Sequence, residues 1–266
     1  MAGENNKVVI VTGGSSGIGR CTASALKENG CIVYEFSRRN IPMEGVTHLS
    51  VDVTNAEADN AAVQHIIQKE TKIEAVLNCA GFGISGAVEF TSMEQAKAQF
   101  DVNFFGTVTV NKAVLPFMRH QGKGHIVNIS SVASVAHIPF QTFYSASKAA
   151  VSSYSYALAN EVKPYGIHVT VVELGDICTG FTKARQKNIL GDEEYGGRIS
   201  RSVSQMEHDE QNGMDPARIG RYIAGIVEKK DPAVVYVAGA QYKFLSLLCK
   251  LLPAAARGKI VGKIYG

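Results

Sequence analysis

Short runs rich in valine and isoleucine alternate with stretches of helical period along most of the chain, and this alternation constrains the fold most. The apolar runs lie at 7–14, 31–37, 46–54, 73–81, 124–131, 167–175 and 233–239. Helical patterns lie between them at 17–30, 55–70, 92–122, 142–166 and near 215–230. Because the runs are continuously apolar, helices should cover both faces of the sheet. The pattern predicts a doubly wound α/β fold with a parallel sheet of about seven strands.

The domain organisation follows from length and continuity. The chain has 266 residues, 45% of them hydrophobic, which suffices for the core of one such domain. No linker, repeat or low-complexity tract interrupts the alternation. The sequence therefore predicts a single domain over residues 1–266.

Charge, hydropathy and cysteine usage argue against several classes of protein. The net charge is +3 and the two signs are mixed along most of the chain, so no nucleic-acid-binding stripe is expected. No apolar run reaches the roughly 18 residues of a membrane-spanning helix. The first residues, MAGENNKVVIVTGG, do not resemble a secretory signal. Five scattered cysteines suggest neither a metal site nor a disulfide framework, and a cytoplasmic protein is predicted.

The glycine-rich turn after the first strand, TGGSSGIG at 12–19, predicts dinucleotide binding. Ligands of such sheets bind beyond the carboxyl ends of the strands. Glycine lets the backbone approach a pyrophosphate, and the following helix offers its N-terminal amides. The residues expected to hold the cofactor here are Gly13, Ser15, Ser16, Gly17, Ile18 and Gly19.

The residues after the second strand favour NADP(H) over NAD(H). Ser37, Arg38 and Arg39 stand where an acidic residue would bind the ribose hydroxyls of NAD. A guanidinium suits a 2′-phosphate, whereas a carboxylate repels one. Glu35, two residues before Ser37, leaves NAD use open.

Later strand ends offer further candidate cofactor contacts. Asp52 could accept a hydrogen bond from the adenine amino group, or could instead belong to the turn that starts the next helix. Small residues after the fourth strand would let a cofactor lie against the backbone. These candidate residues are Asp52, Val53, Asn78, Ala80, Gly81, Gly175 and Thr179.

Tyr144 and Lys148, in TFYSASKAA at 142–150, are a candidate catalytic pair. The spacing of four residues puts them on one helix face. About one such pair is expected by chance in this chain, so the spacing alone is weak evidence. A phenol has a pKa near 10, which a nearby ammonium lowers, so Tyr144 could act as a general acid or base.

Taken together, the motifs resemble the short-chain dehydrogenase/reductase family, whose domain is of Rossmann type. TGGSSGIG, NCAG, VNFFG, NISS and YSASK occur in the family's order, and Ser131 lies thirteen residues before Tyr144. The resemblance assigns Ser131 to the substrate oxygen, Lys148 to the nicotinamide ribose, and Asn103 to a water beside Lys148. It also implies an Ile177 contact with the carboxamide, a lid over 176–215, and a homodimer or homotetramer.

The substrate is expected to be a small hydrophobic alcohol or ketone. Phe82, Ile84, Val135, Ile138 and Phe140 are candidate walls of an apolar pocket. The sequence around the motifs is similar to the hydroxysteroid (seventeen-beta type) and retinol dehydrogenase branch, which implies a steroid or bile acid. A 3-oxoacyl-carrier-protein reductase and a non-catalytic dinucleotide sensor are the alternatives.

The C-terminal segment 240–266 is basic and amphipathic. It contains no acidic residue, whereas its basic residues are Lys243, Lys250, Arg257, Lys259 and Lys263. The leucine-rich stretch 242–252 is expected to present one apolar face, formed by Phe244, Leu245, Leu248, Leu251 and Leu252. That face could contact an anionic membrane, pack on a partner subunit, or cap the substrate end of the domain.

Overall fold

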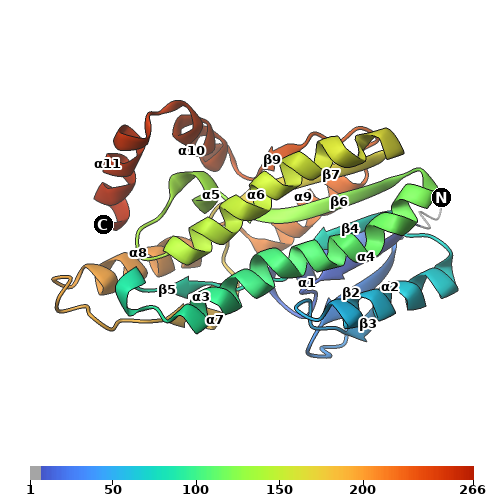
Figure 1. Cartoon of the computed structure of the whole chain (residues 1–266), viewed down its shortest axis with the longest axis horizontal. Helices are drawn as coiled ribbons and strands as arrows, with labels where there is room; N and C mark the ends of the chain where they lie inside the picture. The colour runs from blue at the N-terminus through green and yellow to red at the C-terminus, as the bar shows by residue number, and fades with distance from the viewer. Residues whose placement is uncertain (1–6) are drawn as a thin grey trace.

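Seven strands form one parallel sheet in the computed structural model, which describes residues 7–266 (Figure 1). Their order across the sheet is β3-β2-β1-β4-β6-β7-β9. The strands are β1 (Val8–Thr12), β2 (Ile32–Ser37), β3 (Val46–Ser50), β4 (Ala75–Asn78), β6 (Gly124–Ser131), β7 (Ile167–Leu174) and β9 (Val235–Val237). The predicted doubly wound α/β fold is confirmed.

Helices cover both faces of the sheet. On one face lie α1 (Gly17–Glu28) and α9 (Pro216–Val227). On the other lie α2 (Ala56–Glu70), α4 (Gly106–Gln121) and α6 (Thr142–Val162). This arrangement explains why the central strands carry no polar alternation, since neither of their faces meets water.

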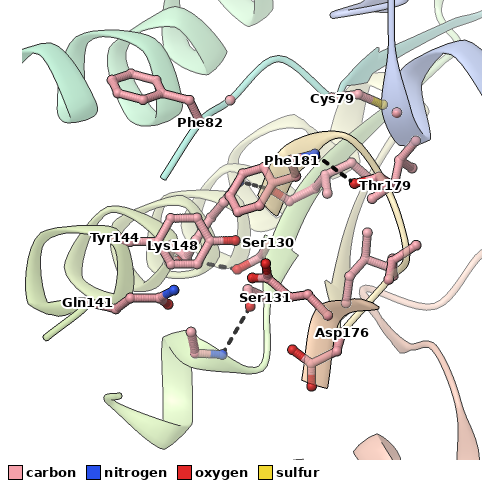
Figure 2. Close-up of a pocket in the computed structure, with 18 of the residues that line it drawn as sticks. Cys79, Phe82, Ser130, Ser131, Gln141, Tyr144, Lys148, Asp176, Thr179 and Phe181 are labelled. Atoms are coloured by element: carbon pink, nitrogen blue, oxygen red, sulfur yellow. Dashed lines mark hydrogen bonds between the residues drawn. The ribbon is translucent and has the colours of Figure 1, made fainter. Parts of the chain in front are cut away.

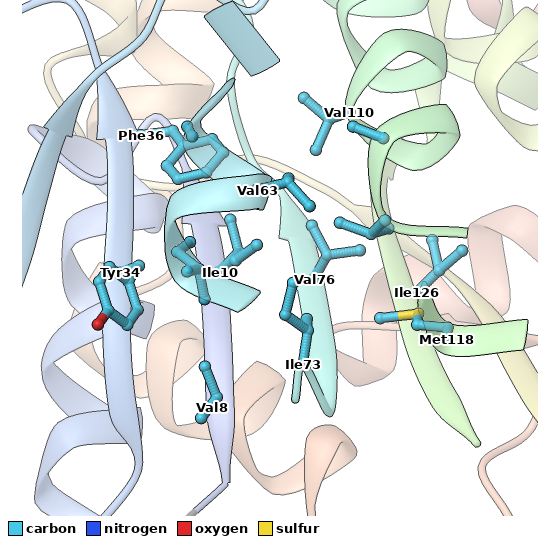
Figure 3. Close-up of a cluster of buried hydrophobic side chains, with 14 of the residues drawn as sticks. Val8, Ile10, Tyr34, Phe36, Val63, Ile73, Val76, Val110, Met118 and Ile126 are labelled. Atoms are coloured by element: carbon cyan, nitrogen blue, oxygen red, sulfur yellow. The ribbon is translucent and has the colours of Figure 1, made fainter. Parts of the chain in front are cut away.

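The strand β1 shows how side chains divide between the two cores. Val8 and Ile10 pack on the α2, α4 and α6 side, together with Ile126 of β6 (Figure 3). Val9 and Val11 point the opposite way, into the core beneath α1 and α9. All four valines and isoleucines are fully buried, as the two-residue period of a strand between two helical layers requires.

The helical pattern at 92–122 proves to be three elements rather than one long helix. The helix α3 (Met93–Phe100) passes into η2 (Asp101–Phe105), a π-helical turn, which continues as α4. The prediction of a single helix over this range was therefore wrong in detail. Sequence periodicity does not locate the wider turn, because the helical pattern on each side of it keeps the same 3.6-residue period.

The lid region and the C-terminus contain elements that were not predicted individually. A two-stranded ladder joins β5 (Ile84–Ser85) to β8 (Gln186–Lys187). The lid also contains α7 (Phe181–Ala184) and α8 (Arg198–Gln211). Minor helices elsewhere are η1 (Val88–Phe90), α5 (Ala133–Ala136) and η3 (Lys163–Tyr165).

Two helices rather than one amphipathic segment form the C-terminus: α10 (Ala240–Leu251) and α11 (Ala254–Tyr265), separated by Pro253. Glu173 of β7 is fully buried and accepts hydrogen bonds from Ser246 Oγ (2.6 Å) and Lys250 Nζ (2.9 Å). These bonds tie α10 to the end of the sheet. None of the helices within residues 7–266 is long and apolar enough to cross a membrane.

Candidate active site

A large cleft lies at the carboxyl ends of the strands and is lined by residues at the ends of β2, β6 and β7 and in the turns after β1, β3 and β4. Its volume is about 1070 Å³. One half is lined by the glycine-rich turn and the ends of β2, β3 and β4, and the other half by α6, the lid and the C-terminal helices. Figure 2 shows the region around Tyr144, where these two halves meet.

The glycine-rich turn has the geometry of a phosphate cradle. Gly13 and Gly17 have φ of +70° and +54°, which favour glycine. A Cβ on Gly19 would lie 2.5 Å from the carbonyl oxygen of Gly13, so only glycine lets the turn fold this tightly. The helix α1 starts at Gly17, and its first three residues line the cleft, so its N-terminal amides border the cleft. The turn therefore fits a dinucleotide pyrophosphate, and all six residues predicted here line the cleft.

The end of β2 presents cations rather than a carboxylate to the cleft. Ser37, Arg38 and Arg39 all line it, and the Arg38 side chain is 77% exposed. Glu35 lies beneath Gly14 and contacts His48 and the Ser37 hydroxyl, and it faces a separate small pocket. The one acidic residue that left NAD use open is thus turned away from the cofactor cleft.

The residues after β3 and β4 divide between the cleft and the core. Asp52, Val53, Ala80 and Gly81 line the cleft. Asp52 Oδ1 also accepts hydrogen bonds from the amide and the hydroxyl of Thr54. The Asp52 carboxylate therefore stabilises the turn before α2, which is one of the two roles that the sequence left open. It also lines the cleft.

Asn78 does not reach the cleft, although the sequence suggested it as a cofactor contact. The side chain is buried, and its Nδ2 donates to Asn111 Oδ1 (2.7 Å) and Asn128 Oδ1 (2.8 Å). These three asparagines bond across β4, β6 and α4. These hydrogen bonds lie inside the core, so the Asn78 amide group holds β4 against β6 and α4 rather than facing a ligand.

Three of the four predicted catalytic side chains meet at one point of the cleft. Ser131 ends β6, and Tyr144 and Lys148 lie on one face of α6 (Figure 2). The Lys148 ammonium lies 5.9 Å from the centre of the Tyr144 ring and donates to the carbonyl of Ile129 (2.9 Å). Ser130 bonds instead to Ser152 and to the carbonyl of Lys148, which is a structural role.

Asn103, the fourth, lies behind the others in the π-helical turn η2. It accepts from the Phe82 amide and donates to the Phe82 carbonyl, both at 3.0 Å, and it donates to Ser147 Oγ (3.2 Å). A Cβ on Gly81 would lie 3.1 Å from Asn103 Oδ1 and 3.7 Å from Lys148 Nζ, so both polar groups border Gly81. The wider π turn directs the Asn103 side chain toward Gly81, where its two hydrogen bonds hold the Phe82 backbone.

Burial changes the pKa values of the pair in opposite directions. It raises the pKa of Tyr144 to about 12, although a hydrogen bond with Ser131 opposes the change, and the nearby Glu210 carboxylate adds to it. Burial lowers the pKa of Lys148 to about 8. At neutral pH the phenol is therefore protonated and the amine charged, a pairing suited to giving a proton to a carbonyl oxygen.

The substrate half of the cleft differs from its predicted walls. Phe82 and Ile138 line it as expected, whereas Phe140 packs with Ile199 and Met206, and Val135 packs beneath α10 and α11. Much of the apolar wall comes from the C-terminal helices, which sequence reasoning did not assign to the pocket. These residues are Leu245, Leu248, Leu252, Ile260, Val261 and Ile264.

Two carboxylates also line this half of the cleft, and sequence reasoning did not single them out. Glu210 of α8 pairs with the buried Arg185 and accepts from the Thr182 hydroxyl (2.7 Å). Asp176 lies two residues after the end of β7. Gly175, Ile177 and Thr179, predicted around the nicotinamide, line the cleft on either side of it. Among the described residues, no three His, Cys, Asp or Glu side chains converge to hold a metal ion.

Comparison with known proteins gives a family match over most of the chain. The model of the family described as "short chain dehydrogenase" matches residues 7–190. This range includes Asn103, Ser131, Tyr144 and Lys148. The match ends within the lid, before the C-terminal helices that complete the cleft.

Individual relatives agree with this match. The 3-ketodihydrosphingosine reductase of Bacteroides thetaiotaomicron is 44% identical over 229 residues, which cover 85% of each chain. A short-chain dehydrogenase from Streptomyces avermitilis superposes with a TM-score of 0.82 at 28% identity, covering 98% of both chains. A 3-ketoacyl-(acyl-carrier-protein) reductase from Brucella melitensis, with a TM-score of 0.74 at 20% identity over 87% and 96% of the chains, shares the fold.

Proposed function

The chain belongs to the short-chain dehydrogenase family, and from that premise we propose that it reduces the keto group of 3-ketodihydrosphingosine or a closely similar long-chain α-amino ketone. The observation that carries this proposal is the 44% identity to the Bacteroides enzyme over 85% of both chains. The oxidoreductase class follows from the family. The sphingoid substrate replaces the steroid or bile acid that we expected from the sequence.

The shape of the cleft supports a long alkyl substrate. The compound has a keto carbon next to a carbon that bears an amino group, followed on the other side by a long saturated chain. The keto group fits at Tyr144 and Ser131, and the alkyl chain fits along the apolar wall of α10 and α11. Burying such a chain contributes about 0.8 kcal/mol per methylene, so a wall of leucines and isoleucines favours it strongly.

The protein groups have separate tasks in the proposed reduction. Ser131 holds the carbonyl oxygen by a hydrogen bond, and the Tyr144 hydroxyl donates its proton to that oxygen. Lys148 stabilises the resulting phenolate and binds the nicotinamide ribose, and Asn103 would hold a water beside Lys148. The bound cofactor supplies the hydride. The turn at 12–19 and the end of β2 would hold its phosphates.

We propose NADPH as the preferred cofactor. Arg38 and Arg39 line the cleft where the 2′-phosphate would lie, and Glu35 is turned toward His48. The 2′-phosphate of NADPH can form charge-assisted hydrogen bonds with two guanidinium groups. NADH has no phosphate at this position and cannot form these bonds. The pairing of subunits through α4 and α6 and a cytoplasmic location stay predictions.

The proposed function is tested by absorbance at 340 nm with NADPH and NADH in parallel. The substrates are 3-ketodihydrosphingosine, a ketosteroid, a bile acid ketone and a 3-oxoacyl thioester. We expect turnover of the sphingoid ketone with NADPH, and a kcat/KM at least about tenfold lower with NADH. Turnover of the ketosteroid or the thioester alone would contradict the sphingoid proposal, and equal use of both cofactors would contradict the role of Arg38 and Arg39.

We further propose that the C-terminal helices touch an anionic lipid bilayer, which fits a substrate with a long alkyl chain. The face predicted from the sequence is divided in the structure: Leu245, Leu248 and Leu252 line the cleft, whereas Phe244 and Leu251 point outward. Phe244 and Leu251 are 68% and 74% exposed, and Leu247, Ile260 and Ile264 on the same two helices are exposed as well. We refer to these five exposed side chains of α10 and α11 as the apolar patch.

The surroundings of this apolar patch favour a bilayer as its occupant. Lys243, Lys259 and Lys263 are exposed beside it, and no acidic residue occurs from Ala240 onward. Ile260 and Ile264 belong both to the patch and to the cleft wall, so the cleft opens at the patch. A lipid substrate could therefore enter from the bilayer without crossing water.

Sedimentation with vesicles of mixed zwitterionic and anionic phospholipid tests this contact. Replacing Phe244, Leu247 and Leu251 together by glutamine should lower the bound fraction of the full chain about tenfold or more, because the apolar contact is lost. The matched control replaces Ile189 and Leu190, which are equally exposed but lie in the lid. Wild-type protein that stays in the supernatant, or a triple variant that sediments normally, would overturn the proposal.

A further inference from the structure

We infer that the carboxylate of Asp176 binds the amino group of the substrate and thereby selects α-amino ketones over simple ketones. This inference rests on the proposed reduction of a sphingoid ketone. Neither the family match nor the relatives assign a role to this side chain. Four observations carry it: its place in the cleft, the way it is held, its lack of a cationic partner, and the chemistry of the substrate.

Asp176 lies in the reaction cleft close to the proton donor. It follows β7 by two residues, at the strand end next to Ser131 of β6. Asp176 lines the same cleft as Ser131 and Tyr144, and Figure 2 shows its carboxylate below these two residues in that view. The charge of Asp176 is near enough to act on the Tyr144 phenol and help raise its pKa.

The side chain is held in place before any substrate arrives. The Tyr242 hydroxyl donates to Asp176 Oδ2 at 2.8 Å, and the Asp176 carbonyl accepts from the Met214 amide at 2.9 Å. Gly175 lets the Tyr242 ring come this close, because a Cβ there would lie 2.3 Å from the ring. A carboxylate fixed in this way can bind a ligand without losing much rotamer freedom.

Asp176 has no cationic partner among residues 7–266, whereas the nearby Glu210 forms an ion pair. Glu210 pairs with Arg185, whereas no lysine or arginine within residues 7–266 forms an ion pair with Asp176. Burial raises the pKa of Asp176, and the charges of Glu210 and Asp209 add to the change. A half-buried carboxylate without a counter-ion is costly, so a ligand cation placed there would be bound favourably.

The basic side chains that line this part of the cleft do not pair with Asp176. Lys148 donates to the carbonyl of Ile129, and Arg257 donates to the carbonyl of Cys249. Lys183 of the short helix α7 lines the cleft without forming an ion pair to Asp176. The negative charge near the reacting carbonyl is therefore available to the substrate.

The chemistry of an α-amino ketone matches this arrangement. Its ammonium group lies one carbon from the carbonyl carbon, so fixing the carbonyl oxygen at Tyr144 and Ser131 also fixes the ammonium nearby. An N⁺–H to carboxylate hydrogen bond is among the stronger contacts that a protein makes with a ligand. The bond would also orient the carbonyl face toward the nicotinamide.

The experiment compares two ketones of equal chain length, 3-ketodihydrosphingosine and its analogue without the amino group. For each enzyme form, the measured quantity is the ratio of the two kcat/KM values with NADPH. Wild-type protein should prefer the amino ketone, and Asp176→Asn should lower the ratio by about 10- to 100-fold, the size of one charge-assisted hydrogen bond. Asparagine keeps the shape and can still accept the Tyr242 hydrogen bond.

The matched control is Asp209→Asn, because Asp209 is a neighbouring carboxylate that bonds to Tyr265 and does not line the cleft. It should leave the ratio unchanged. A wild-type preference that Asp176→Asn retains, or equal use of both ketones by the wild type, would overturn the inference while the ketone reductase stands. If the wild type reduces neither ketone, the proposed function itself fails. Thermal melting and NADPH binding show that each variant is folded.

Discussion

Replacing Tyr144 by phenylalanine should lower kcat for ketone reduction by about 10²- to 10⁴-fold, while the Kd for NADPH changes little. The substitution removes the only group that we place to donate a proton to the carbonyl oxygen. It leaves the ring in its contact with Phe181, whose centre lies 5.8 Å away. Steady-state kinetics give kcat, and quenching or enhancement of NADPH fluorescence gives the Kd.

A second tyrosine on the same helix serves as the matched control. Tyr154 of α6 accepts a hydrogen bond from Asn111 at 3.5 Å and packs against Phe104, away from the cleft. Tyr154→Phe should therefore keep kcat within about twofold of the wild type. Unchanged turnover in Tyr144→Phe would overturn the proposed mechanism and assign the proton transfer to another group, whereas a wild type without turnover on any ketone would favour the non-catalytic dinucleotide sensor.

Replacing Lys148 by methionine should lower kcat/KM by about 10²-fold or more, because the charge that stabilises the Tyr144 phenolate is lost. In the cofactor-free protein, burial lowers the pKa of Lys148 to about 8. The ammonium is thus present below that pH and lost as the pH rises through it. The KM for NADPH should stay level below about pH 8 and rise above it.

The pH profile of each form distinguishes this explanation from a general loss of fold. The Tyr144 phenol, with a pKa of about 12, stays protonated over the same range and gives no inflection near 8. Lys148→Met should lack the inflection, whereas Lys163→Met, which changes an exposed lysine just beyond α6, should keep it. An inflection near 8 that persists in Lys148→Met would assign it to another group.

The order of the helices and strands was predictable because strands that are buried on both faces of the sheet appear in the sequence as continuous apolar runs. Strands such as Val8–Thr12 have no polar face, and the helices between them repeat at their own period. The role of Gly13, Gly17 and Gly19 was predictable for the same kind of reason, since the turn needs a positive φ at the first two and leaves no room for a Cβ at the third. The spacing of Tyr144 and Lys148 fixes them on one helix face whatever surrounds them.

Other parts of the site depend on contacts between distant segments. Asn78 and the cleft-lining Ala80 lie two residues apart, yet Asn78 turns inward because Asn111 and Asn128 are there to accept its hydrogen bonds. Asn103 faces Gly81 only because a π-helical turn widens the helix at that point. The orientation of these two asparagine side chains has no local sequence signal, since the residues that they contact lie twenty or more positions away in the chain.

The sequence by itself determined the sheet, the cofactor turn and the tyrosine–lysine pair, because each follows from local periodicity or backbone sterics. The tertiary structure alone decided what surrounds the substrate. It brought α10 back over the end of β7, where Tyr242 holds Asp176 and the leucines of the tail divide between the cleft and the surface. That docking depends on Glu173, a buried carboxylate whose partners Ser246 and Lys250 lie more than seventy residues further along the chain.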